Sequence, residues 1–171
     1  VGYSNNAGGL CGYIYGSIVE GEKARIGLDF LGEDSEISSS SEHAGGMVGY
    51  LVRTMDLTGN NYISAVDKDP KRNENQNEDK TSLLISSGDG QDLTAGGLVG
   101  THENYQDKGS VTIQDTAIFG EVHLQSPGNN GMTGGFIGRL GRGNMANATI
   151  TNSFASIYCK SNGDSGRAGG F

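Results

Sequence analysis

The chain has 171 residues, of which 30 are glycine, two are proline and none is tryptophan, and its hydrophobic share is 34%. This lean apolar content favours a repetitive fold over one thick core, and collagen is excluded because no Gly-X-Y period exists. The net charge of −8 argues against a nucleic-acid partner, and no apolar run approaches the roughly 20 residues that a membrane-spanning helix requires.

A glycine-bracketed apolar segment, here called the signature, recurs along the chain. It reads Ala-Gly-Gly-Leu-Cys-Gly at 7–12 and returns at 44–49, 95–100 and 133–138, with a shortened copy at 168–171. Successive copies begin 37, 51, 38 and 35 residues apart. A nearly constant interval of this size indicates a protein built from stacked repeats, in which each repeat contacts only its neighbours.

The signature also sets the expected domain organisation, a single repeat region over residues 1–171. The repeats are expected at about 7–43, 44–94, 95–132 and 133–167, with a partial repeat at 168–171. Because the last copy is cut short and stacked repeats need capped ends, we expect the chain to be an excerpt of a longer one. The long interval contains an insertion at 67–80 with no apolar side chain except proline, which predicts a solvated loop.

The signature glycines are expected to be structural. Adjacent apolar residues, as in Leu98-Val99, do not fit a strand with one buried face, but fit a segment covered on both faces or a tight corner. The paired glycines allow either a positive φ or a close approach between the backbones of neighbouring repeats. The glycines concerned are Gly8, Gly9, Gly12, Gly45, Gly46, Gly49, Gly96, Gly97, Gly100, Gly134, Gly135 and Gly138.

Between signatures, apolar and polar residues alternate with the period of a strand that buries one face. The residues expected to face inward are, in chain order, Ile26, Leu28 and Phe30; Ile63 and Ala65; Leu83 and Ile85; Val111 and Ile113; Val122 and Leu124; Ala148 and Ile150; and Ile157 and Cys159. Each repeat would hold about three strands, and no segment has helical spacing. The sequence therefore predicts an all-β fold, a parallel β-solenoid (β-helix) of about four coils from 35–38 residue repeats, with little or no helix.

The two cysteines take the places of apolar residues in other repeats. Cys11 aligns with Val48 and Val99 in the signature, and Cys159 aligns with Leu124. They belong to the first and fourth repeats, which a spacing of about 4.8 Å per repeat separates by about 14 Å, beyond the roughly 7 Å limit for a disulfide. We therefore expect two free, buried thiols.

In the third and fourth repeats, a strand that ends in a polar pair follows the signature. These strands read Ile-Gln-Asp-Thr-Ala at 113–117 and Ile-Thr-Asn-Ser-Phe-Ala at 150–155. This arrangement resembles the GLUG-type repeat of bacterial secreted and cell-surface proteins, including adhesins and non-catalytic regions of immunoglobulin A proteases. The resemblance implies an extracellular or bacterial cell-surface location and a structural or adhesive role, and it names no active site.

The polar pairs are expected to form a ladder through neighbouring repeats rather than a catalytic site. The residues of this ladder are Asp115, Thr116, Asn152 and Ser153. Polar side chains after a strand usually bond local backbone, and no acidic pair recurs at equivalent positions. We therefore predict no catalytic residues and a protein that is not an enzyme.

The remaining candidate residues indicate no cofactor site. His43, His102 and His123 lack the close spacing of a metal or catalytic cluster and are expected at the surface. Carboxylates in the Gly-rich turns at 88–92 and 162–166 leave calcium open as an alternative to ordinary turns, although neither turn matches a known calcium loop. Outward aromatics such as Tyr105 and Tyr158 are further candidates for contact with a sugar or a protein.

These observations favour a non-catalytic extracellular scaffold, a stiff stalk or display surface in adhesion. Its expected partners are neighbouring coils of the same longer chain, and a host or matrix protein or glycan, or other copies of itself. Two alternatives stay open. One is a self-assembling filament subunit, and the other is a polysaccharide-acting β-helix enzyme, which would need carboxylates close together on one face.

Overall fold

The computed structural model describes residues 5–21, 24–31, 34–66, 82–91, 93–104, 109–142, 147–162 and 165–170. Within these ranges the chain forms twenty β-strands and no helix, and every strand pairing is parallel. The all-β class is thus confirmed, and no described helix could cross a membrane. The insertion at 67–80, Tyr105 and parts of the turns at 88–92 and 162–166 lie outside the described residues.

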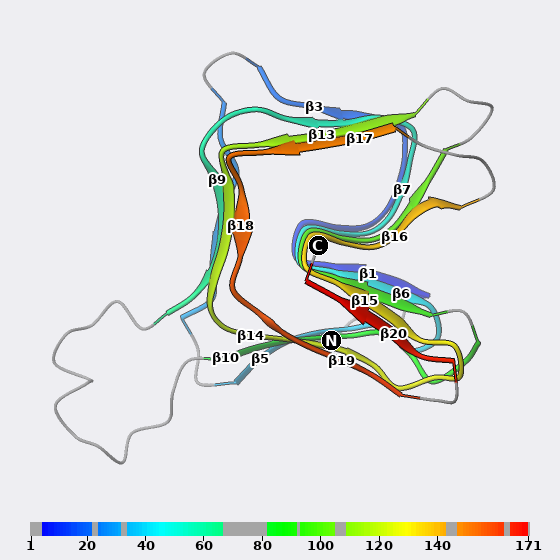
Figure 1. Cartoon of the computed structure of the whole chain (residues 1–171). Coiled ribbons are helices and arrows are strands. Elements are labelled where there is room, and N and C mark those ends of the chain that lie inside the picture. Colours follow the sequence, from blue (N-terminus) through cyan, green and yellow to red (C-terminus); the bar gives the residue numbers. More distant parts are fainter. Residues whose placement is uncertain are drawn as a thin grey trace, which may run out of the picture.

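Each strand pairs with the equivalent strand of the next repeat, so equivalent strands lie over one another (Figure 1). The first residue of each signature copy lies directly before the glycine pair. In the structure these first residues are aligned across neighbouring strands, Ala7 with Ala44, Ala44 with Ala95, and Ala95 with Thr133. The alignment of Cys11 with Val48 is also found. The register of the sheets therefore follows the signature.

Four sheets result from this pairing. The five-stranded sheet contains β1 (Asn6–Gly8), β6 (His43–Gly45), β11 (Thr94–Gly96), β15 (Met132–Gly134) and β20 (Arg167–Gly169). One four-stranded sheet contains β2 (Cys11–Tyr15), β7 (Val48–Val52), β12 (Val99–Glu103) and β16 (Ile137–Arg142). The other contains β3 (Ile18–Val19), β8 (Met55–Leu57), β13 (Ser110–Gln114) and β17 (Asn147–Thr151).

The seven-stranded sheet is joined through the long strand β14. It contains β4 (Gly27–Asp29), β9 (Asn61–Ala65), β14 (Thr116–Ser126), β10 (Ser82–Ser86) and β5 (Asp34–Ser38), while β18 (Phe154–Ala155) and β19 (Tyr158–Ser161) also pair with β14. The second repeat thus has five short strands, β6 to β10, where the sequence predicted about three. One extra strand arises because the signature bends and is divided between β6 and β7, and the other is β8 (Met55–Leu57), which the sequence did not predict.

The signature forms a tight corner at which the chain turns from the five-stranded sheet into the β2–β7–β12–β16 sheet (Figure 1). Leu98 and Val99 are both fully buried, so this segment is a corner and is also covered on both faces. A Cβ on Gly97 would lie 2.0 Å from the carbonyl oxygen of Gly135 and 2.5 Å from Cδ1 of Ile118. Among the described glycines only Gly120 and Gly141 have a positive φ. Glycine is therefore required here for close approach of the backbone, both within the corner, as at Gly134, and between neighbouring repeats, as at Gly97.

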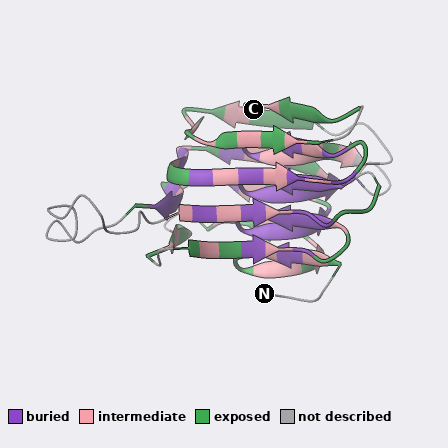
Figure 2. Ribbon diagram, turned by 90° about the horizontal axis from the view of Figure 1, so that it is seen from below, coloured by how far each residue is buried: buried purple, intermediate pink, exposed green. Residues whose placement is uncertain are grey.

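The inward-facing residues are fully buried in the middle of the stack and partly exposed at its ends (Figure 2). The predicted inward residues of the second and third repeats are all buried, namely Ile63, Ala65, Leu83, Ile85, Val111, Ile113, Val122 and Leu124. In the first and fourth repeats, Ile26, Leu28, Phe30, Ile150, Ile157 and Cys159 are half-buried and pack against this core. Ala148 is exposed, contrary to the prediction, because β17 has a paired strand on one side only.

Both cysteines are free, as predicted, but neither is fully buried. Cys159 aligns with Leu124, and Cys11 aligns with Val48, so their positions are those of core residues. They are half-buried because each lies in an outer repeat. Burial nevertheless raises the pKa of the Cys159 thiol, while a hydrogen bond with Thr133 opposes this effect.

Two histidines are buried, and their predicted surface location is wrong. His43 is 3% exposed and begins β6, where the Thr94 hydroxyl of the next repeat lies 3.0 Å from its Nδ1 atom. His102 is fully buried in β12, and its Nε2 atom hydrogen-bonds the carbonyl oxygen of Arg53. Such bonds offset the cost of burying a polar ring. His123 lies on an outward position, as predicted, with its side chain 41% exposed.

His102 is expected to make the fold sensitive to acid. Burial lowers the pKa of His102, against the opposing effects of the Arg53 carbonyl and the Glu103 carboxylate. The unfolded chain therefore binds more protons than the folded chain as the pH falls below about 6.5, and the free energy of unfolding decreases there. We expect His102→Leu, which copies the aligned Leu51, to reduce this slope in urea unfolding midpoints measured between neutral and mildly acidic pH.

His123→Leu is the matched control for this prediction, since it removes an exposed histidine. Comparison of the two variants separates the effect of burying a histidine from the effect of losing any histidine. If the urea midpoint fell with pH equally in the His102→Leu variant and the unmodified chain, the burial of His102 would not be the cause of the acid sensitivity.

Candidate functional site

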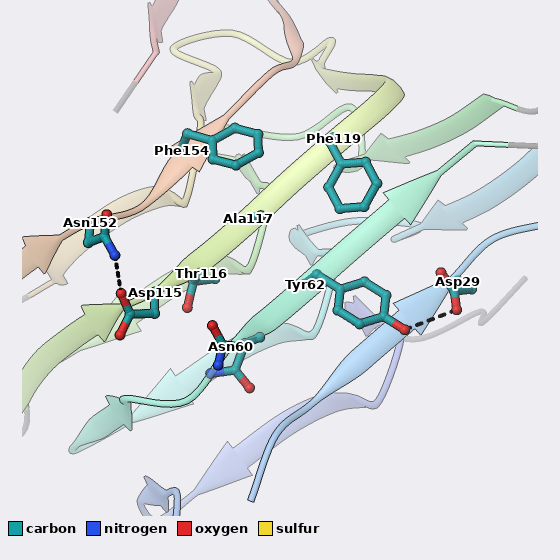
Figure 3. A pocket seen from close by; sticks show the side chains of 10 residues that line it. Asp29, Asn60, Tyr62, Asp115, Thr116, Ala117, Phe119, Asn152 and Phe154 are labelled. Atoms are coloured by element: carbon teal, nitrogen blue, oxygen red, sulfur yellow. Dashed lines mark hydrogen bonds between the residues drawn. The ribbon is translucent and has the colours of Figure 1, made fainter.

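A surface hollow of about 400 Å³ lies on the outer face of the seven-stranded sheet. Residues from all four repeats line it, because β4, β9, β14 and β18 cross it side by side (Figure 3). The lining combines aromatic rings with carboxylates, amides and a hydroxyl, and none of the described residues that line it is basic. We call it the aromatic hollow.

Three aromatic side chains come from three successive strands. Tyr62 belongs to β9, Phe119 to β14 and Phe154 to β18. The first two face outward because their neighbours Ile63 and Ile118 are fully buried on the inner face. The ring centroids of Tyr62 and Phe119 are 6.2 Å apart, with 37° between the ring planes. Phe154 is 55% exposed, so part of the aromatic surface is open to solvent.

Each ring lies beside a small residue in the preceding repeat. Tyr62 aligns with Gly27, and a Cβ on that glycine would lie 2.5 Å from the tyrosine ring. Phe119 aligns with Ser64, which is fully buried. The missing or small side chains let the rings lie along the sheet, so these two rings are held in place before any ligand arrives.

Two carboxylates border the rings. Asp29 accepts a hydrogen bond of 3.1 Å from the Tyr62 hydroxyl, which fixes one end of that ring. Asp115 accepts hydrogen bonds from the side-chain amides of Gln114, at 3.0 Å, and Asn152. These bonds hold the pKa of Asp115 below its usual range, so the carboxylate is ionised at neutral pH.

The residues of the expected polar ladder lie at the corner that leads into the seven-stranded sheet. Asp115 and Asn152 have φ values of 51° and 46°, a left-handed conformation that Asp and Asn adopt more readily than most residues. They hydrogen-bond each other across neighbouring repeats. The Thr116 backbone N–H donates to the Ser153 hydroxyl at 3.1 Å, so the second residues of the two pairs are also joined. Three of the four residues, Asp115, Thr116 and Asn152, line one end of the aromatic hollow, and Ser153 supports them through its bond to Thr116.

The two carboxylates of the hollow lie at opposite ends of it (Figure 3), which disfavours their action as a catalytic pair. Asp29 aligns, two repeats away, with Phe119, and Asp115 lies four residues before Phe119. Standard strand dimensions then give about 16 Å between the Cα atoms of the two aspartates. Glycoside hydrolysis needs carboxyl groups about 5 to 9.5 Å apart.

The other predicted residues lie elsewhere. The signature glycines form the corner described above and do not line the hollow. Among the described residues no group of three or more His, Cys, Asp or Glu side chains could hold a metal ion. Tyr158 is 59% exposed and lies on a neighbouring part of the same sheet, with its ring 5.6 Å from that of His123.

The sequence analysis did not identify the aromatic residues of the hollow as candidate site residues. The alternation that places Ile63 inward also places Tyr62 outward, and the same holds for Phe119 beside Ile118. This signal was present for each strand alone. What the sequence did not supply is the register that brings rings from three repeats onto one surface.

Comparisons with known protein families, curated proteins and solved structures find no match. The class of protein is therefore defined by geometry: an all-β chain of parallel sheets whose outer face carries an aromatic hollow.

Proposed function

We propose that the chain is a parallel β-solenoid of about four coils and acts as a non-catalytic scaffold. In this proposal it belongs to a bacterial surface or secreted protein of the GLUG-repeat type and serves as a stiff stalk or display surface in adhesion. The observation that carries the proposal is the in-register parallel pairing of equivalent strands in successive repeats through every sheet.

The contacts between repeats support a mechanical role. At the signature corner, the Leu98 N–H donates to the Phe136 carbonyl at 2.8 Å, and the Met47 N–H donates to the Leu98 carbonyl at 2.9 Å. The same bond thus recurs from repeat to repeat, in addition to the ladders of the sheets. Repeats that are bonded to both neighbours in this way resist bending, and they can hold surface residues at fixed spacings.

The separation of Asp29 and Asp115 supports a non-catalytic role over the polysaccharide-cleaving alternative. The test is incubation of the protein with soluble polysaccharides, followed by measurement of new reducing ends. No release above a buffer control is expected, whereas release that follows the protein through purification would establish an enzyme.

Self-assembly is the second candidate, and the distribution of exposed apolar side chains favours it. Among the residues that the structure describes, eight of the nine exposed large hydrophobic ones belong to the first and last complete repeats, namely Leu10, Tyr13, Tyr15, Val19, Leu31, Leu140, Phe154 and Tyr158. Outer strands with unpaired edges can add strands from another molecule. Sedimentation velocity from micromolar to millimolar concentration separates the two roles, because a display scaffold stays monomeric and a filament subunit forms a growing series of species.

A further inference from the structure

We propose that the aromatic hollow binds a neutral polysaccharide chain lying across strands β9, β14 and β18. This inference rests on the proposed role as a display scaffold and names the ligand class that the displayed surface takes. It concerns a recognition site, and no bond of the ligand is broken.

The aromatic rings supply the first half of the argument. The faces of sugar rings carry C–H groups that pack on aromatic faces, and Tyr62, Phe119 and Phe154 offer such faces on three successive strands. The Tyr62 hydroxyl is hydrogen-bonded to Asp29, and its ring packs directly over the backbone of Gly27. A ring that is already fixed loses little conformational entropy when a ligand binds, so the platform is pre-organised.

The polar groups supply the second half. Sugar hydroxyls both donate and accept hydrogen bonds, and the hollow provides carboxylates at Asp29 and Asp115 together with amides at Asn60 and Asn152. Because Asp115 is ionised and none of the described lining residues is basic, an anionic ligand would meet repulsion that these residues do not compensate. The set therefore selects a neutral ligand rich in hydroxyl groups.

A cationic peptide is the competing ligand class, because cations also pack on aromatic faces. The geometry favours the sugar. The Cα atoms of Asp29 and Asp115 are about 16 Å apart by strand geometry, so the described lining residues do not concentrate negative charge at one point that would attract a cation.

The extent of the hollow indicates a chain rather than a single sugar. Its lining runs from Asp29 in the first repeat to Phe154 in the fourth. Three steps between repeats of about 4.8 Å give a length of about 14 Å, which several linked sugar units would span.

The test is isothermal titration calorimetry with soluble oligosaccharides of β-linked glucose, β-linked N-acetylglucosamine and α-linked mannose, at low and high salt. We expect at least one of them to bind with an affinity that salt leaves unchanged. Phe119→Ala and Phe154→Ala should each weaken that binding about tenfold, which corresponds to the loss of one stacking contact. Tyr158→Ala is the matched control, since it removes an exposed aromatic ring that does not line the hollow.

Phe154→Ala guards against a folding artefact, because that side chain is 55% exposed and contributes little to the core. The absence of binding to all three oligosaccharides would overturn the proposal, as would binding that both phenylalanine variants retain. Salt-sensitive binding of oligolysine in place of the sugars would also overturn it and would identify a cationic ligand. If the protein is monomeric and keeps its repeat register but binds none of the oligosaccharides, the proposed ligand class is wrong and the proposed scaffold role is unaffected.

Discussion

Gly97→Ala is expected to destabilise the fold by about 3 kcal/mol, the upper part of the range for forcing extra atoms into a packed interior. The added Cβ would lie 2.0 Å from the carbonyl oxygen of Gly135, far inside van der Waals contact. That oxygen belongs to the backbone of the next repeat and cannot rotate away as a side chain could. The two repeats must therefore separate, which weakens neighbouring hydrogen bonds such as that from the Gly97 N–H to the Gly134 carbonyl.

Gly170→Ala is the matched control, because Gly170 occupies the same place in the signature and has no atom within 4 Å of the added Cβ. Urea unfolding of the two variants and the unmodified chain provides the comparison. The free energy of unfolding should fall strongly for Gly97→Ala and change little for Gly170→Ala. Equal effects of the two substitutions would contradict the close approach of the repeats at the signature.

Leu98→Ala is expected to have the second large effect, a loss of about 2 to 5 kcal/mol. Leu98 is fully buried at the corner and belongs to the continuous core that runs through the repeats. Removal of its side chain leaves a cavity that the paired backbones on either side prevent from closing. The cost therefore includes both the lost burial of apolar surface and the cavity itself.

Leu10→Ala makes the same chemical change at the same signature position, but Leu10 is 52% exposed. Thermal and urea unfolding should show a loss well below that of Leu98→Ala, because solvent already reaches the Leu10 side chain. If the two leucines proved equally costly, the difference in burial between the middle and the first repeat would be refuted.

Much of the β-structure could be predicted from local patterns. Alternation along a strand is a property of the strand itself, so Val111 and Ile113 were correctly assigned to the buried face. The alignment of Cys11 with Val48 followed from the signature alone, since equivalent positions of a repeat meet the same neighbours. These predictions needed no knowledge of how the chain bends between strands.

The errors arose where the position along the stack decides the environment. Ala148 and Cys159 have the sequence pattern of core residues, but they lie in the fourth repeat and have fewer neighbours. His43 has polar neighbours in the sequence, yet it faces Thr94 of the next repeat in the interior. Burial of a polar group depends on such a partner from another repeat, which local composition does not reveal.

The candidate site was missed for a related reason. Tyr62 and Phe119 lie 57 positions apart in the sequence, and only the pairing of β9 with β14 brings their rings together. The polar ladder residues had a stronger local signal, because Asp115 and Asn152 follow equivalent strands. Their role in shaping the hollow required the corner geometry.

Disulfide trapping across neighbouring repeats tests the central claim, in-register stacking, most directly. With Cys11→Val and Cys159→Leu as background, Thr112→Cys and Thr149→Cys place two thiols on aligned residues of β13 and β17. Paired strands put their Cα atoms about 4.8 Å apart, within the range for a disulfide. The control pair, Thr112→Cys with Thr151→Cys, is offset by two residues to about 8 Å, which is too far.

Mild oxidation followed by mass spectrometry of the cross-linked peptides gives the result. The account predicts nearly complete disulfide formation in the aligned pair and little in the offset pair. Equal cross-linking of the two pairs, or preferential cross-linking of the offset pair, would contradict the in-register stacking on which the fold, the aromatic hollow and the proposed scaffold role depend.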